Sequence, residues 1–171
     1  TGGSTYAYQF NEYTRRYGGS HDDVGHLVVN SRRNGLKVPW GYYTLHEPEP
    51  FTHEDYVNGR YINAPLNLFD NDRPVNAAGC YVLTTAEKAQ DMKQTPVYIW
   101  NHAEHQAAHR STVQTLDESQ EWCGLEARKT LEGAGLAIEE VDIFNPYDGF
   151  TLFTQTWLEA FGWHGVKEGE A

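Results

Sequence analysis

The chain has 171 residues, the size of one ordinary domain with a buried core, and 39% of them are hydrophobic and 13% aromatic. Its 24 acidic and 13 basic residues give a formal net charge of -11, which disfavours non-specific binding to nucleic acid or to anionic membranes. The sequence has no apolar run of about 18 residues, the length that a membrane-spanning helix needs. We therefore expect no nucleic-acid partner and no insertion into a membrane.

The early part of the chain shows helical spacing. Gly18-Gly19 ends the first predicted helix, and Ser20 then caps a second that runs to about Arg33. A proline-rich loop over 39–50 separates it from a short helix, from about His53 to Tyr61. The first helix is indicated by four aromatic residues on one face: Tyr6, Phe10, Tyr13 and Tyr17.

From residue 65 onward, predicted strands alternate with predicted helices. This order favours an α/β fold. The chain is expected to consist of two similar units, 1–92 and 93–171, which meet near Met92 to Pro96. The first and the third of the strands given below are expected to be buried. The elements are a strand over Ala77–Leu83, a helix capped by Thr84 or Thr85, a strand over Val97–Trp100, a helix from about Asp117 to Gly133, a strand over Val141–Phe144 and a helix over Phe150–Phe161.

The two cysteines lie far apart in the sequence and form neither a CxxC motif nor a disulfide framework. We expect both to be structural, with Cys80 in a packed strand and Cys123 in a packed helix. A reducing compartment, and hence the cytoplasm, is the simplest expectation. Because the chain begins at Thr1 without an initiator methionine, we expect it to be part of a longer protein.

The segment VDIFNPYDGFTLFTQTWLEAF is the most informative stretch, because it joins a short apolar strand to an amphipathic helix through a polar corner. Pro146 and Gly149 interrupt regular structure there, which places Tyr147 and Asp148 at the corner. In layered α/β folds, ligands bind where a strand ends and a helix starts. Asp148 is expected to cap the helix, and Tyr147 is the candidate for chemistry.

Several segments resemble the middle of a thiolase-superfamily subunit: YTRRYGGSHDDVGHLVVNSRRNG, FTHEDYVNGRYINAPLNLFDNDRPVNAAGCYVLTTAEKA, VYIW, the helix ending LEGAG, and VDIFNPYDGFTLFTQTWLEAFG. The YDGF corner is most similar to thiolase-like lipid-transfer proteins that act as acyl-CoA aldolases in steroid side-chain degradation. The resemblance implies a layered αβαβα fold that is incomplete in this chain. It also implies a homodimer and a small OB-fold acyl-CoA-binding partner. The nucleophilic cysteine of thiolases would precede Thr1, so neither Cys80 nor Cys123 takes its place.

The same resemblance implies the chemistry. Thiolases carry Asn-Glu-Ala-Phe, or a version with histidine, where this chain has Tyr147-Asp148-Gly149-Phe150. A phenol can transfer a proton at an alcohol, which favours retro-aldol cleavage of a β-hydroxyacyl-CoA, with Tyr147 as the proton-transfer residue. Asn145 is a candidate for orienting Tyr147 and binding substrate, although capping of the strand end is the more common role for such a residue. No cofactor is expected, since CoA is part of the substrate. The alternatives are a thiolase-type acyltransferase, a non-catalytic carrier of lipid or acyl-CoA, and a Tyr147 that only packs.

Other candidate residues carry weaker signals. Arg32 and Arg33 are candidates for binding the phosphates of CoA, although a helix end would also place them there. Trp40 and His102 are candidate substrate-binding residues, Trp40 as a cover over an apolar substrate and His102 in a loop beside the acyl pocket. The HQAAH motif has Gln106 where a zinc protease needs glutamate, so no metal site is expected.

Overall fold

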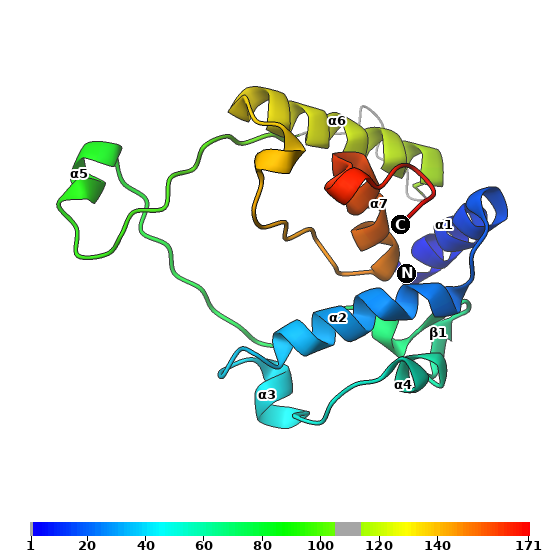
Figure 1. The fold of residues 1–171 in the computed structure, drawn as a ribbon. Coiled ribbons are helices and arrows are strands. Elements are labelled where there is room, and N and C mark those ends of the chain that lie inside the picture. The colour runs from blue at the N-terminus through cyan, green and yellow to red at the C-terminus, as the bar shows by residue number, and fades with distance from the viewer. Residues whose placement is uncertain (1, 105–113) are drawn as a thin grey trace.

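The computed structural model describes residues 2–104 and 114–171, which form a mainly helical body (Figure 1). Within these residues the strands are β1 (Tyr61–Asn63) and β2 (Leu66–Asn67), which pair antiparallel. The α-helices are α1 (Gly2–Tyr17), α2 (Gly25–Gly35), α3 (Tyr42–His46), α4 (His53–Val57), α5 (Ala86–Gln90), α6 (Leu116–Ala134) and α7 (Thr151–Phe161). Short 3-10 helices are η1 (His21–Val24), η2 (Leu68–Asp70), η3 (Ile138–Glu140) and η4 (Trp163–Gly165).

Most helix ends follow from local sequence signals. At the start of α6 the Thr115 hydroxyl accepts a hydrogen bond from the Glu118 backbone N–H, and the Glu118 carboxylate accepts from the Thr115 backbone N–H. Gly135 ends this helix in the left-handed region, at a φ of 66°, where a glycine has no steric penalty. Thr85 caps α5, which confirms the second of the two predicted caps.

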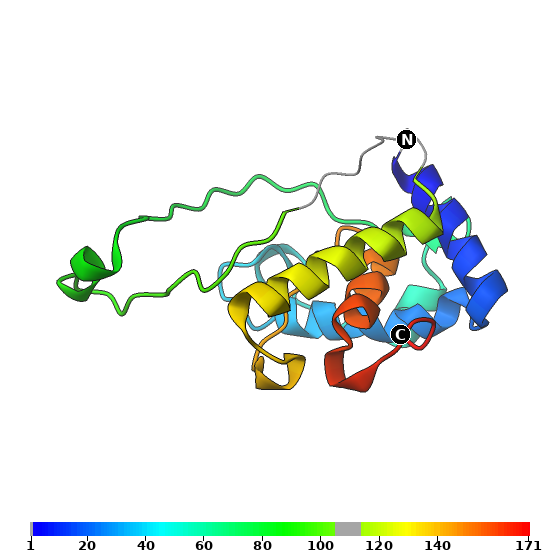
Figure 2. The same cartoon turned by 90° about the horizontal axis from the view of Figure 1, so that it is seen from above.

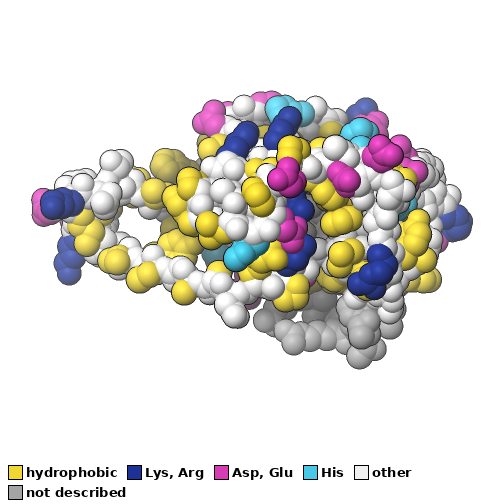
Figure 3. Space-filling view, turned by 90° about the horizontal axis from the view of Figure 1, so that it is seen from below, with side chains coloured by type: hydrophobic (Ala, Val, Ile, Leu, Met, Phe, Trp, Pro, Cys, Tyr) yellow, Lys and Arg dark blue, Asp and Glu magenta, His cyan; other side chains and the backbone are white. Residues whose placement is uncertain are grey.

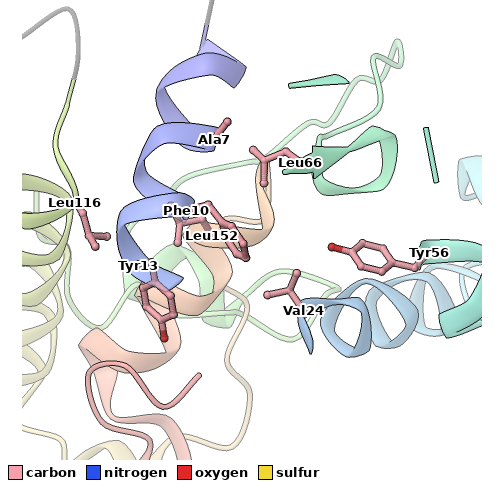
Figure 4. Close-up of a cluster of buried hydrophobic side chains, with 8 residues drawn as sticks. All are labelled: Ala7, Phe10, Tyr13, Val24, Tyr56, Leu66, Leu116 and Leu152. Atoms are coloured by element: carbon pink, nitrogen blue, oxygen red, sulfur yellow. The ribbon is translucent and has the colours of Figure 1, made fainter. Parts of the chain in front are cut away.

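The core forms where α1 meets α7 and the first turn of α6 (Figure 4). Phe10 of α1 is 1% exposed and Leu152 of α7 is 2% exposed, and the aromatic face predicted for α1 supplies Phe10 and Tyr13 to this cluster. Helix α6 packs across α7 (Figures 1 and 2). The core thus fixes α7, and with it the polar corner that precedes this helix. The buried members of the core are Ala7, Phe10, Tyr13, Val24, Tyr56, Leu66, Leu116 and Leu152.

The three strands predicted over 77–83, 97–100 and 141–144 are not formed. Tyr81, Val97 and Ile143 are 89%, 94% and 83% exposed, so the burial expected of the first and the third strand is wrong as well. Residues 76–99, here called the projecting arm, leave the helical body and return to it, with α5 at the tip (Figures 1 and 2). Hydrophobic side chains lie along this arm (Figure 3). Isolated extended backbone cannot satisfy its own N–H and C=O groups, and the described residues place no neighbouring strand beside it.

The predicted αβαβα layers are therefore not seen: among the described residues there is one sheet, of two strands. Cys80 lies on the arm and is exposed, so its predicted packing is wrong, whereas Cys123 is buried on α6 as predicted. Burial raises the pKa of the Cys123 thiol to about 12, which makes it a poor nucleophile. The predicted boundary near Met92 to Pro96 falls within the arm.

Two predicted boundaries in the first half also differ. The loop expected over 39–50 contains α3, and the helix expected to reach Tyr61 ends at Val57. Gly59 makes a close approach in the turn that follows, where an added Cβ would lie 2.8 Å from both the Tyr56 carbonyl oxygen and Asn67 Nδ2. The turn that places Tyr61 in β1 therefore leaves no room for a side chain at position 59. In the two described ranges, no helix combines the length and the apolar character needed to cross a bilayer.

Candidate active site

The polar corner at residues 145–150, here called the elbow, is held by contacts with the end of η2. The Asp72 backbone N–H donates to the Gly149 carbonyl oxygen at 2.9 Å, and Asn71 forms an isolated β-bridge with Phe150. One residue further on, the Thr151 hydroxyl donates to Asp70 Oδ1 at 2.9 Å. Three consecutive residues, 70–72, thus fix the start of α7 and the end of the elbow.

Tyr147 lies on the elbow with 57% of its surface exposed. Its ring contacts Phe153 at a centroid distance of 5.6 Å, and among the described residues its hydroxyl has no hydrogen-bond partner. The alternative in which a packed Tyr147 bonds its hydroxyl to the backbone is therefore not what the structure shows. The phenol is free to meet a ligand.

A second tyrosine, Tyr6, lies near Tyr147. Tyr6 of α1 packs against Phe150 and Phe153, with ring centroids 4.1 Å and 4.9 Å away. Burial raises the pKa of Tyr6, and the nearby Tyr147 raises it further. Sequence reasoning placed Tyr6 on the buried face of the first helix but gave no signal that it would adjoin the elbow.

The elbow also borders a cleft of about 660 Å³ between α2, α3 and α7. Asn145 and Asp148 line this cleft, and Arg32 faces them from α2. The Ser31 hydroxyl lies 3.4 Å from Asp148 Oδ2 and donates to it from the α2 side. Asp148 therefore faces the cleft and does not cap α7, which has no side-chain cap. Tyr147 stands between the cleft-lining residues Pro146 and Asp148 but is not itself part of the lining.

The cationic wall of the cleft consists of two arginines that share one carboxylate. Arg32 Nη2 lies 2.8 Å from Glu47 Oε2, and Arg73 Nη2 lies 2.9 Å from Glu47 Oε1. Arg32 also stacks over the Tyr43 ring at 3.7 Å, and Arg73 over the Tyr42 ring at 4.8 Å. Both guanidinium groups line the cleft, together with the carboxylates of Asp72 and Asp148. Arg73 was not predicted, because no local motif marks it.

The remaining predicted residues do not reach the cleft lining. Arg33 is exposed and donates to Asn30 Oδ1 at 2.6 Å, so the two adjacent arginines point to different surroundings. Trp40 is 79% exposed, and His102 is exposed in the segment that leads from the arm. The HQAAH histidines lie outside the described residues. Among the residues that are described, no three His, Cys, Asp or Glu side chains gather as metal ligands would.

No protein-family profile matches the sequence. A 17-hydroxy-3-oxo-4-pregnene-20-carboxyl-CoA lyase from Mycobacterium tuberculosis is 34% identical over 98% of this chain and 45% of its own length. A steroid side-chain-cleaving aldolase from Thermomonospora curvata is 27% identical over 93% of this chain and 40% of its own length. The chain therefore spans less than half the length of these curated relatives.

Among solved structures, the Ltp2-ChsH2(DUF35) aldolase superposes with a TM-score of 0.77 over 99% of this chain and 44% of that chain, at 24% identity. This agreement shows a shared fold. A benzoylsuccinyl-CoA thiolase subunit from Thauera aromatica is a more distant match. The chain is thus homologous, over nearly all its length, to steroid side-chain-cleaving aldolases and more distantly to thiolases, which confirms the resemblance predicted from its sequence.

Proposed function

We propose that this chain is part of an acyl-CoA aldolase that cleaves a β-hydroxyacyl-CoA, on a steroid side chain, into a ketone and a shorter acyl-CoA. The observation that carries the proposal is the free phenol of Tyr147, which stands on the elbow beside a 660 Å³ cleft. Relatives named as a CoA lyase and as a steroid side-chain-cleaving aldolase support the reaction and its substrate class.

The proposed reaction needs two proton transfers and no redox step. A base removes the proton of the β-hydroxyl group, the Cα–Cβ bond breaks, and its electron pair moves into the thioester enolate as the ketone forms. A proton then returns to Cα of the shorter acyl-CoA. Tyr147 is assigned to one of these transfers, and hydrogen-bond donors stabilise the enolate. No cofactor takes part, because the thioester itself accepts the electron pair.

The cleft offers groups that suit a CoA thioester. The guanidinium groups of Arg32 and Arg73 favour phosphate or pyrophosphate, and the rings of Tyr42 and Tyr43 offer a flat apolar surface. Asn145 is assigned to substrate binding on the elbow side of the cleft, across from Arg32. Arg33, Trp40 and His102 keep their proposed roles only if further parts of the protein complete the cleft around them.

We propose the layered αβαβα fold, a homodimer and a cytoplasmic location for the whole protein. The exposed apolar segments of the projecting arm support the layered fold, because strands of this composition are stable when neighbouring elements cover them. An acyl-CoA-binding partner of the OB-fold type is proposed because the structural neighbour is an aldolase named together with ChsH2(DUF35). The units 1–92 and 93–171 would then contribute to the two similar halves of the subunit.

Direct assay of the full-length protein, with its partner, tests the proposal. A steroid β-hydroxyacyl-CoA should yield free ketone and shortened acyl-CoA in equal amounts, measured by mass spectrometry. Thiolytic cleavage of the corresponding β-ketoacyl-CoA by added CoA, with no ketone released from the β-hydroxyacyl-CoA, would instead identify a thiolase. Tight binding of the thioester without any product would identify a carrier.

Replacing Gly149 with alanine is expected to lower the aldolase kcat about 10-fold or more without unfolding the protein. A Cβ at this position would overlap with the hydroxyl and the ring edge of Tyr147, so the ring must swing away. Gly124→Ala is the matched control, because a Cβ there meets nothing within 4 Å. Steady-state kinetics and circular dichroism of both variants check this expectation, and an unchanged kcat in Gly149→Ala would contradict it.

A further inference from the structure

A fully buried carboxylate lies beneath the elbow. Asp70 is 1% exposed, and its Oδ1 accepts hydrogen bonds from the Tyr56 hydroxyl at 2.7 Å and from the Thr151 hydroxyl at 2.9 Å. Its Oδ2 accepts from the Asn67 backbone N–H at 2.6 Å and lies 2.7 Å from His21 Nε2. The network joins η1, α4, β2 and the first residue of α7.

The Tyr56 hydroxyl acts as a fixed donor in this network. Tyr56 is 0% exposed, and burial together with the Asp70 carboxylate raises the pKa of its phenol far above the ordinary value, so the phenol keeps its proton. Figure 4 shows this hydroxyl pointing from α4 toward the core. Asp70 is therefore held on several sides by elements that are independent of the elbow.

Thr151 is the link from this network to the elbow. It is 7% exposed and begins α7 directly after Phe150, and its hydroxyl is the one side-chain group of α7 that bonds to Asp70 among the described residues. A carboxylate near the start of a helix is also favoured by the helix dipole. The contacts of Asn71 with Phe150 and of Asp72 with Gly149 continue the same attachment.

We infer that Thr151 is a positioning residue for the reaction, which acts through Asp70 to hold the elbow and the Tyr147 phenol in place. This inference rests on the proposed aldolase function. Thr151 shares this task with the backbone contacts of residues 71 and 72 and with the Ser31–Asp148 hydrogen bond, and the Tyr147 hydroxyl itself is unbonded within the described chain. Loss of the Thr151 hydroxyl should therefore let the elbow move without changing the lining of the cleft far from it.

Two variants of the full-length protein with its partner test the inference. Thr151→Val keeps the side-chain volume and removes the hydroxyl, and Thr151→Ser keeps the hydroxyl. The matched control is Thr156→Val, because Thr156 is also buried on α7, at 3% exposure, but within the described residues its hydroxyl donates to the Leu152 carbonyl oxygen of the same helix and not to Asp70. The readouts are kcat and KM for aldol cleavage, and amide hydrogen exchange of residues 147–153.

Thr151→Val should lower kcat about 10-fold with KM changed little, and should speed exchange in residues 147–153. Thr151→Ser and Thr156→Val should each keep kcat and the exchange of residues 147–153 close to the values of the unmodified protein. An unchanged kcat in Thr151→Val, or an equal loss in Thr156→Val, would overturn the inference. If the unmodified protein lacks aldolase activity, the proposed function fails, and hydrogen exchange alone decides: faster exchange supports the anchoring by Thr151, and unchanged exchange overturns it.

Discussion

Replacing Tyr147 with phenylalanine is expected to lower kcat for aldol cleavage about 10²- to 10⁴-fold, the usual range for loss of an acid-base group. The fold should survive, because the side chain is 57% exposed and its hydroxyl has no partner among the described residues. Removing it leaves no buried donor or acceptor unpaired. Binding of the thioester should persist, since the cleft lining does not include this ring.

Tyr8→Phe provides a matched control. Tyr8 lies on α1 and is also 57% exposed, so the same chemical change there tests for a general effect of losing a surface phenol. Steady-state kinetics and isothermal titration with a non-cleavable thioester analogue separate turnover from binding. A Tyr147→Phe enzyme that still released ketone at the normal rate would remove the phenol from the mechanism and leave the second tyrosine, Tyr6, or a residue elsewhere in the protein to transfer the proton.

The parts of the fold that sequence predicts are those fixed by near neighbours in the chain. Thr52 with Asp55, and Thr115 with Glu118, complete capping boxes within four residues, and Gly135 ends α6 on its own. The predicted strands depend on partners instead. Ile143 and Val97 have strand-forming side chains, yet a strand exists only where another backbone lies beside it, which the described residues do not supply.

The site shows the same division. The elbow was predicted because Pro146 and Gly149 mark a turn locally. The cationic wall could be predicted only in part, because Arg32 belongs to a basic pair that is visible in the sequence. Its ion pair with Glu47, and that of Arg73 with the same carboxylate, could not be predicted, since no periodicity connects these residues. Asp70 carries no local signal of its role, and only the structure shows that it is buried and bonded to the first residue of α7.

Replacing Asp70 with asparagine is expected to lower the free energy of unfolding of the full-length protein by about 1–3 kcal/mol, the cost of leaving a buried donor without its acceptor. The carboxylate accepts hydrogen bonds at both oxygens, from Tyr56 and Thr151 at one and from the Asn67 backbone at the other. An amide presents N–H groups at one of these positions, where donors already point, so at least one buried donor loses its acceptor. Asn for Asp changes the volume little, which excludes a cavity as the cause.

Urea unfolding followed by tryptophan fluorescence measures the effect, since the chain has 5 tryptophans. The midpoint should fall while the slope with denaturant stays the same, because the buried surface of the folded state is unchanged. The control is Asp142→Asn, at an exposed aspartate, which should leave the midpoint where it was. If Asp70→Asn unfolds at the same urea concentration as the unmodified protein, the network does not hold η1, α4 and α7 together, and the other contacts of the elbow, such as those of residues 71 and 72, must fix it.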